Sequence, residues 1–452
     1  MFREMFQKIK KRDFSGNSGL AIKNSSYFFS SNFIGKIGSL IFTIIIARLL
    51  MPELFGLYSL TLATIILFAT ISELGTSKCI IKFVSNAITN KKRGKAKTYF
   101  LYFAKIKVFL LFLASFMLIV LAKYLATNYY NKPIYLALLA GSFYIIITGF
   151  IGLFETALQS INKFKPSLWK ESIFQILRII LIPFLIIYVI KHNFSNEKIL
   201  FSIITGLTMI YFFISIILFF IMKKEANFLK NKKVNLTKEE EKYSKRFFIF
   251  IMASILSGVF LGYIDIFMLG HFVEANFIGF YQAAFSIIGA IYPLIPFSFV
   301  LFPIFNKLKG KRLNEGFGKS LKIIMFFSFL FFIGVFIFAP LIIKIIFGNN
   351  YLSSIMILRI LSCLIFITPI TALYMDYFYV IDRPKLITIL LITTTILDIF
   401  LNYFLITWLL NYSQIMAIIG AGIATILSKI ILLICLILFK KKQMQLKGGK
   451  TK

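Results

Sequence analysis

Long apolar stretches recur along the whole chain, and they constrain its fold more than any other feature. Each is about 20 residues or longer, the length at which an α-helix spans the hydrocarbon core of a bilayer. Fifty-nine per cent of the 452 residues are hydrophobic, whereas soluble domains are about half apolar. We therefore predict an all-α polytopic membrane protein.

Twelve spans are expected, six in each half of the chain. The N-terminus is basic, but the apolar run that follows is too long and too polar-striped for a cleaved signal peptide. We interpret it as a retained first span. The predicted spans are 25–48, 56–76, 99–122, 134–160, 168–190, 199–222, 247–270, 277–303, 320–346, 352–380, 386–410 and 414–439.

The charged loops predict the orientation. Of the 51 lysines and arginines, 39 fall on one set of alternate loops and termini, and 6 fall on the other set. Cytoplasmic loops carry the excess of Lys and Arg, so both termini are expected in the cytoplasm and the protein in the plasma membrane. The net charge of +34 is then a topology signal with attraction to anionic membrane lipid at the cytoplasmic face, not a nucleic-acid footprint.

The longest cytoplasmic loop divides the chain into two lobes of equal topology. Because each lobe begins and ends inside, any repeat relating them is parallel. An offset of 223 residues aligns FGLY at 55–58 with IGFY at 278–281, and Arg48 with His271. The predicted parts are a basic N-terminus (1–23), an N-lobe (24–222), a linker (223–246), a C-lobe (247–439) and a basic tail (440–452).

Polar residues form a stripe on the first span. Their spacing of three, four or seven puts them on one helical face, and the span ends in an elbow at Arg48 and Pro52. Such a stripe lines either a water-filled lumen or a helix–helix contact. The stripe contains Ser25, Asn32, Lys36, Ser39 and Thr43.

Four ionisable residues lie near the middle of predicted spans, where charge is costly and usually faces a cavity or a partner. Lys36, Arg178 and Lys429 are interpreted as candidate lumen cations that bind the substrate headgroup. Asn32 on the first span and Gln175, which shares a face with Arg178, are the polar candidates beside them. Asp398 shares a face with Asn402, and two readings stay open for it: ion coupling or a structural ion pair with Lys429. Three cations against one anion at this depth favour an anionic substrate.

Other charged residues fall near predicted span ends, where a gate or rim role competes with a purely structural one. Arg48, Asp265 and Arg359 lie toward outer ends, and Glu73 lies near an inner end. We treat these four as gate or rim candidates.

Several function classes are disfavoured by what the sequence lacks. It has no P-loop motif, and its three cysteines and two histidines have no metal-ligand spacing. No external loop is long enough for a catalytic domain, so a membrane glycan polymerase or ligase is a weak alternative. We expect a transporter with no catalytic residues, no metal and no cofactor.

Five stretches resemble the polysaccharide and lipid-linked oligosaccharide flippase family of the multidrug/oligosaccharidyl-lipid/polysaccharide (MOP) exporter superfamily. The elbow ARLLMPELFGLYSL (47–60) and ISELGTSKCIIKF (71–83) are similar to its opening. LFPIFNKLKGK (301–311) resembles its loop after the eighth helix, and APLIIKIIFGNNYLSS (339–354) resembles its joint between helices nine and ten. DIFLNYFLI (398–406) with GAGIATILS (420–428) is similar to its last two helices.

The resemblance implies a V-shaped bundle, like that of the multidrug and toxin extrusion (MATE) transporters, that works by alternating access. Its lumen would take the anionic headgroup of a lipid-linked oligosaccharide, which is the expected partner. Other polysaccharide-assembly proteins are further candidate partners. Related drug exporters carry acidic residues in a lobe, often on the first helix, where this chain has Lys36. A cation-coupled drug or metabolite exporter of the same fold is the main alternative.

Overall fold

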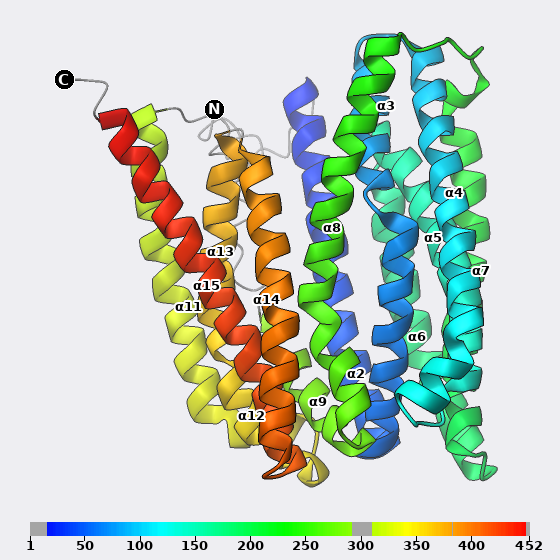
Figure 1. Ribbon diagram of the computed structural model, residues 1–452. Helices are drawn as coiled ribbons and strands as arrows, with labels where there is room; N and C mark the ends of the chain where they lie inside the picture. Colours follow the sequence, from blue (N-terminus) through cyan, green and yellow to red (C-terminus); the bar gives the residue numbers. More distant parts are fainter. Residues whose placement is uncertain (1–15, 292–309, 382, 449–452) are drawn as a thin grey trace. The chain divides into compact units, whose positions relative to one another are not determined.

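The computed structural model describes residues 16–291, 310–381 and 383–448, and every regular element within them is helical (Figure 1). Nine helical segments in this part are long and apolar enough to cross a membrane, and two shorter apolar helices accompany them. The prediction of an all-α, multi-pass membrane protein is confirmed. The elements are α2 (Gly16–Glu73), α3 (Thr76–Thr89), α4 (Arg93–Tyr124), η1 (Leu125–Tyr129), α5 (Tyr135–Ser160), α6 (Lys165–Lys191), α7 (Asn196–Glu225), η2 (Asn227–Lys230), α8 (Lys238–Phe272), α9 (Ala275–Ile291), α11 (Gly310–Ile346), η4 (Asn349–Tyr351), α12 (Ser354–Leu361), α13 (Cys363–Val380), α14 (Pro384–Leu410) and α15 (Gln414–Gly448).

Two compact units make up the chain. Unit 1 contains the residues up to Ile45 together with Phe68–Ala122 and Tyr135–Met252, and unit 2 contains Ile46–Leu67, Lys123–Ile134 and the residues from Ala253 onward. Both units therefore include parts of the first half of the sequence. The lobe boundaries expected from the loop pattern stay a prediction.

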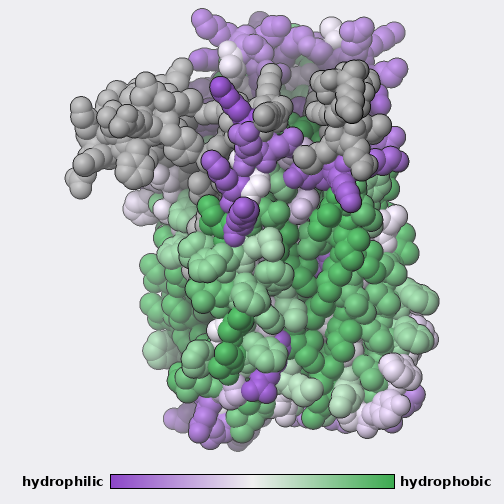
Figure 2. Space-filling view, turned by 90° about the vertical axis from the view of Figure 1, so that its left-hand side faces the viewer, coloured by the Kyte–Doolittle hydropathy of each residue, from purple (hydrophilic) through white to green (hydrophobic). Residues whose placement is uncertain are grey.

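Hydrophobic side chains cover the middle of the helices, and hydrophilic ones gather toward helix ends, as the face in Figure 2 shows. Within unit 1, α5 and α6 both pack on α7; within unit 2, α14 packs on α15 and α11 on α13. Large apolar side chains such as Phe184 and Phe326 stay exposed. That distribution suits helices whose outer surfaces contact lipid, because lipid tails are as apolar as the side chains.

The first two predicted spans are joined in α2 by a kink at Met51 and Pro52. Proline lacks a backbone N–H and disfavours a helical conformation in the residue before it. Met51 accordingly has φ 58° and ψ 170°, and the helix resumes from Pro52. The expected elbow is therefore a sharp kink rather than a loop.

The elbow of α2 and the start of α9 approach each other through two glycines of unit 2. A Cβ on Gly56 would lie 1.8 Å from the carbonyl oxygen of Ala275, and one on Gly279 would lie 2.1 Å from the carbonyl oxygen of Pro52. Small residues allow such close backbone approach between membrane helices. These glycines are the two that the 223-residue offset aligns, and the same offset relates Pro52 to Ala275.

The charged run of the predicted linker is the beginning of α8 rather than a separate helix. Thr237 and Glu240 form a capping box at its start: Thr237 N–H donates to Glu240 Oε2 at 2.9 Å, and Glu240 N–H donates to Thr237 Oγ1 at 3.2 Å. This arrangement satisfies two backbone donors that a helix start leaves open. Part of the eighth predicted span (292–303) and most of the stretch 301–311 lie outside the described residues.

Candidate functional site

Lys36 is exposed on α2 within unit 1 and forms no hydrogen bond or ion pair with a described residue. Asn32, one turn earlier, is also exposed and donates to the Phe28 carbonyl oxygen at 2.8 Å. The neighbouring face of α2 is packed, since Ser31 Oγ donates to the carbonyl oxygen of Ser167 on α6 at 3.2 Å. The polar stripe thus lies beside the helix contact and leaves the Lys36 ammonium group uncompensated in its unit.

Gln175 is buried where α6 crosses α2. Its Nε2 donates to the Gly35 carbonyl oxygen at 3.2 Å and to Glu171 Oε1 at 2.6 Å. A Cβ on Gly38 would lie 2.5 Å from Gln175 Oε1, so the amide fills the space that this glycine leaves. This residue is a structural link between two helices as well as a polar group.

Arg178 lies next to this amide rather than next to Lys36. Its Nε donates to Gln175 Oε1 at 2.8 Å, and its guanidinium carbon lies 4.6 Å from the ring centre of Phe42 and 4.9 Å from that of Phe174. Its Nη2 is buried without a hydrogen-bond partner among the described residues. Stacking on two aromatic rings offsets part of the cost of burying the charge.

Two carboxylates balance one lysine at the start of α6. Lys170 Nζ lies 3.2 Å from Glu155 Oε2 and 3.3 Å from Glu171 Oε2, and all three side chains are less than one fifth exposed. Through Gln175 this cluster continues to Arg178, which donates to the neutral amide. Lys36 is outside the cluster.

Asp265 is the centre of a buried polar network in unit 2, on α8. Its Oδ2 accepts hydrogen bonds from Tyr281 (2.6 Å) and Thr425 (2.7 Å), and its Oδ1 accepts one from Asn402 Nδ2 at 3.1 Å. Four helices, α8, α9, α14 and α15, therefore meet at one carboxylate. The sequence suggested an outer rim position for Asp265. In the structure it contacts Asn402, which follows Asp398 by one helical turn on α14.

Asp398 and Lys429 complete the charged groups of this network. Asp398 is fully buried, and neither of its carboxylate oxygens has a hydrogen-bond partner among the described residues. Lys429 follows Thr425 by one helical turn and lies within electrostatic range of both Asp398 and Asp265. No ion pair within 4 Å joins Lys429 to either carboxylate in this part of the chain, so the interaction is longer-range.

Two of the rim candidates contact other elements of unit 2. Arg48 donates from Nε to the Ile346 carbonyl oxygen at 2.8 Å and from Nη2 to that of Ile345. These are the last carbonyl groups of α11, which a helix end leaves unsatisfied. Arg359 is exposed on α12, with its guanidinium carbon 5.8 Å from the ring centre of Phe336.

Glu73, the inner-end candidate, is ion-paired. Lys107 on α4 donates to Glu73 Oε2 at 2.6 Å and to Ser77 Oγ at 2.9 Å. Lys107 is fully buried, so it does not extend to the interface as its position near a span end suggests. The pair lies at the break between α2 and α3, where Gly75 has φ 83°.

Thr425, Ser77 and the aromatic partners of Lys440 were not evident from the sequence. Lys440 Nζ lies 3.3 Å from the ring centre of Phe317 and 4.9 Å from that of Tyr377. The only sequence signal for Thr425 was its position four residues before Lys429, on the same helical face.

The fold is that of a multi-pass helical membrane protein with buried polar clusters in each unit. The solved structures it resembles include a lipid II flippase, MurJ, in an inward closed conformation, with TM-score 0.68, 18% identity, and 90% of this chain and 87% of the other covered. An inward-facing MATE multidrug resistance transporter of the MOP superfamily matches with TM-score 0.65, 14% identity, and 94% and 99% covered. A MOP superfamily transporter from Pyrococcus furiosus matches with TM-score 0.52, 14% identity, and 94% and 96% covered.

Residues 21–309 match the family of polysaccharide biosynthesis proteins, and the chain belongs to that family. No curated protein sequence matches it. The expected family is thereby confirmed, and the solved structures show that the chain shares the fold of MOP superfamily transporters.

Proposed function

We propose that the protein moves a lipid-linked oligosaccharide, a polyprenyl-diphosphate-sugar, from the inner to the outer leaflet by alternating access. The sugar and diphosphate would pass through a polar lumen while the polyprenyl chain stays in lipid. The family match to polysaccharide biosynthesis proteins supports a glycan-related cargo, and the resemblance to a lipid II flippase supports a lipid-linked one. Both termini are expected in the cytoplasm.

The single observation that carries the proposal is the uncompensated ammonium group of Lys36. Within unit 1, Lys170 is ion-paired with Glu155 and Glu171, whereas Lys36 is exposed on the polar stripe of α2 and has no partner among the described residues. A cation at that depth of a span is costly without an anionic partner. A transported diphosphate supplies such a partner transiently.

The direction of transport agrees with the membrane potential. An inside-negative potential moves an anion outward with roughly 2.3 kcal/mol per charge per 100 mV. Weak binding at several points still permits release on the outer side. No chemical step on the cargo is required.

Replacing Lys36 with alanine should lower the rate of headgroup translocation about tenfold or more, because a hydrogen bond between charged groups contributes about 1.5–3 kcal/mol. The assay uses the full chain in vesicles with a fluorescent polyprenyl-diphosphate oligosaccharide, and it measures how fast the headgroup becomes accessible outside. Lys36→Arg should retain most of the rate. Thermal stability should not change, since Lys36 has no partner to lose.

Lys105→Ala is the matched control, because Lys105 is also an exposed lysine of unit 1, on α4. It should translocate at the rate of the unmodified protein. Normal transport by Lys36→Ala at normal expression would reject the role of this cation.

A second candidate, cation-coupled export of a drug or metabolite, is favoured by the buried carboxylates of Asp265 and Asp398 in unit 2. Our proposal predicts that translocation continues when sodium and proton gradients are abolished, and that it slows when the membrane potential is reversed. Efflux of a cationic dye such as ethidium that collapses with a sodium or proton ionophore would select the exporter instead. Asp398→Asn should then abolish that ionophore-sensitive efflux.

A further inference from the structure

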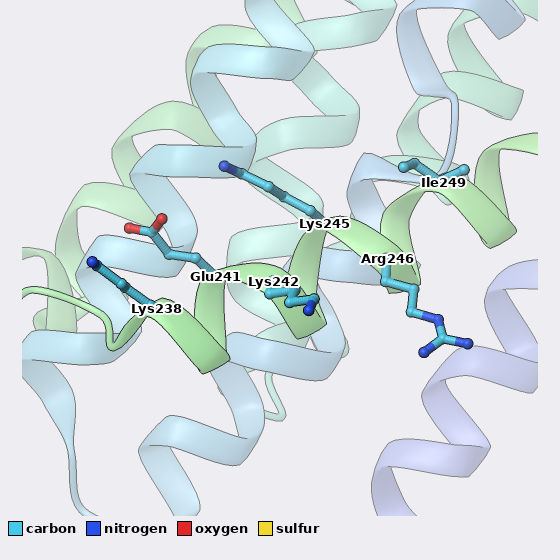
Figure 3. Close-up of a pocket in the computed structure, with 6 residues that line it drawn as sticks. All are labelled: Lys238, Glu241, Lys242, Lys245, Arg246 and Ile249. Carbon is cyan, nitrogen blue, oxygen red and sulfur yellow. The ribbon is translucent and has the colours of Figure 1, made fainter.

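The first turns of α8 bear an exposed basic groove in unit 1 that the proposed transport pathway does not use. Figure 3 shows the side chains that line it, all extending from α8. Three lysines lie at steps of four and three, which places them on one helical face with Ile249. The lining residues are Lys238, Glu241, Lys242, Lys245, Arg246 and Ile249.

The opposite face of the same segment is fixed to the rest of unit 1. Glu240 accepts two hydrogen bonds from Lys95 Nζ, at 2.7 and 2.9 Å. Lys82 Nζ donates to the Tyr243 hydroxyl at 3.1 Å and lies 3.5 Å from the ring centre of Phe247. With the capping box, these contacts hold the helix so that the groove faces away from α3 and α4.

Charge in the groove is strongly unbalanced. Lys238, Lys242 and Lys245 are exposed, and none of them forms an ion pair with a described residue. Glu241 is the one acidic residue among those lining the groove. The groove therefore presents a surplus of positive charge that an anionic group would satisfy.

The charged start of α8 gives way to its apolar part at this groove. Charged residues end at Arg246, the apolar part of α8 begins at Phe247, and Ile249 leaves 59% of its surface exposed. Lysine side chains at such a boundary place their ammonium groups at the level of the lipid headgroups. The ligand that fits has a phosphate beside the lysines and acyl chains beside Ile249.

We propose that this groove binds an anionic glycerophospholipid, with its phosphate on Lys238, Lys242 and Lys245 and its acyl chains along the apolar part of α8. Clusters of Lys and Arg at the cytoplasmic start of a membrane helix attract anionic lipid over zwitterionic lipid. An acidic soluble partner would gain from the lysines but not from the exposed apolar side chain of Ile249.

The test measures lipid association with the full chain in phosphatidylcholine vesicles. Spin-labelled phosphatidylglycerol and spin-labelled phosphatidylcholine are compared by the fraction immobilised at the protein surface. The unmodified protein should prefer phosphatidylglycerol, and Lys238→Gln/Lys242→Gln/Lys245→Gln should lower that preference at least about fivefold. High salt should lower it as well, because exposed charges are screened.

The matched control is Lys224→Gln/Lys232→Gln/Lys233→Gln, which removes the same charge from exposed positions at the end of α7 and in the segment that follows. Its preference should stay near that of the unmodified protein. Equal losses in both triple variants would show generic charge attraction and overturn the site, as would an unmodified protein without preference. Displacement of the labelled phosphatidylglycerol by a short-chain prenyl diphosphate, lost in the groove variant alone, would assign the groove to the cargo.

Folding of the groove variant is checked by its thermal unfolding midpoint, which should match that of the control, because neither the capping box nor the packed face is altered. The measurement is of binding, so its outcome is independent of whether the protein translocates an oligosaccharide.

Discussion

Gly56→Ala and Gly279→Ala should each destabilise the protein by more than about 3 kcal/mol, at the upper end of what overpacking costs. The added methyl group of either variant would overlap a backbone carbonyl oxygen, at 1.8 Å in one case and 2.1 Å in the other. Backbone atoms in helices have no alternative rotamer, so α2 and α9 must separate. Separation also removes packing around the elbow.

The measurement is the midpoint of thermal unfolding in detergent, followed by the loss of monodisperse protein on gel filtration. Gly289→Ala is the control, because Gly289 is also on α9 and a Cβ there meets no atom of the described residues within 4 Å. It should leave the midpoint unchanged or raise it slightly, since alanine favours helices over glycine.

The double variant Gly56→Ala/Gly279→Ala should cost less than the sum of the single variants. Both methyl groups are accommodated by the same helix separation, so the second adds little once the first has moved α2 from α9. If the losses of stability add in the double variant, the backbone relaxes independently at the two glycine contacts. Stable single variants would show that the close approach is absent.

Glu73→Ala should cost about 3 kcal/mol or more, because it leaves the fully buried ammonium of Lys107 with Ser77 as its remaining partner. Lys107→Met should cost less. The carboxylate it leaves behind has 39% of its side chain exposed and can be hydrated. Removing the carboxylate of this ion pair should therefore cost more stability than removing its ammonium group.

The double variant Glu73→Ala/Lys107→Met should recover most of the stability lost in Glu73→Ala, since no buried charge remains. Thermal unfolding of all three variants in the same detergent decides the matter. A double variant as unstable as Glu73→Ala would show that the turn between α2 and α3 needs the pair for its geometry. Equal effects of the two single variants would contradict the burial argument.

The helical fold and the class of protein followed from the sequence because a bilayer limits the choices. Spans of about 20 apolar residues have few alternatives to helices in lipid, and charged loops alternate with them. The kink at Pro52 followed from proline chemistry. The two helices of α2 accordingly meet at Met51, which has a non-helical conformation.

The site was predicted less completely. Helical periodicity put Gln175 beside Arg178 and Asn402 beside Asp398, because those pairs share a helix. It did not bring Asp265 to Asn402, since that contact depends on how α8 and α14 pack. It also did not pair Glu73 with Lys107, because position along a span does not reveal a partner on another helix.

The reciprocal contact of the two elbows has the geometry of an isologous interface. Pro52 meets Gly279 and Ala275 meets Gly56, each pair being the other shifted by 223 residues in opposite senses. A local two-fold axis would generate this reciprocity, as it does where two identical chains pair. Within this single polypeptide the two glycines therefore have equivalent places, each against the backbone of the other elbow.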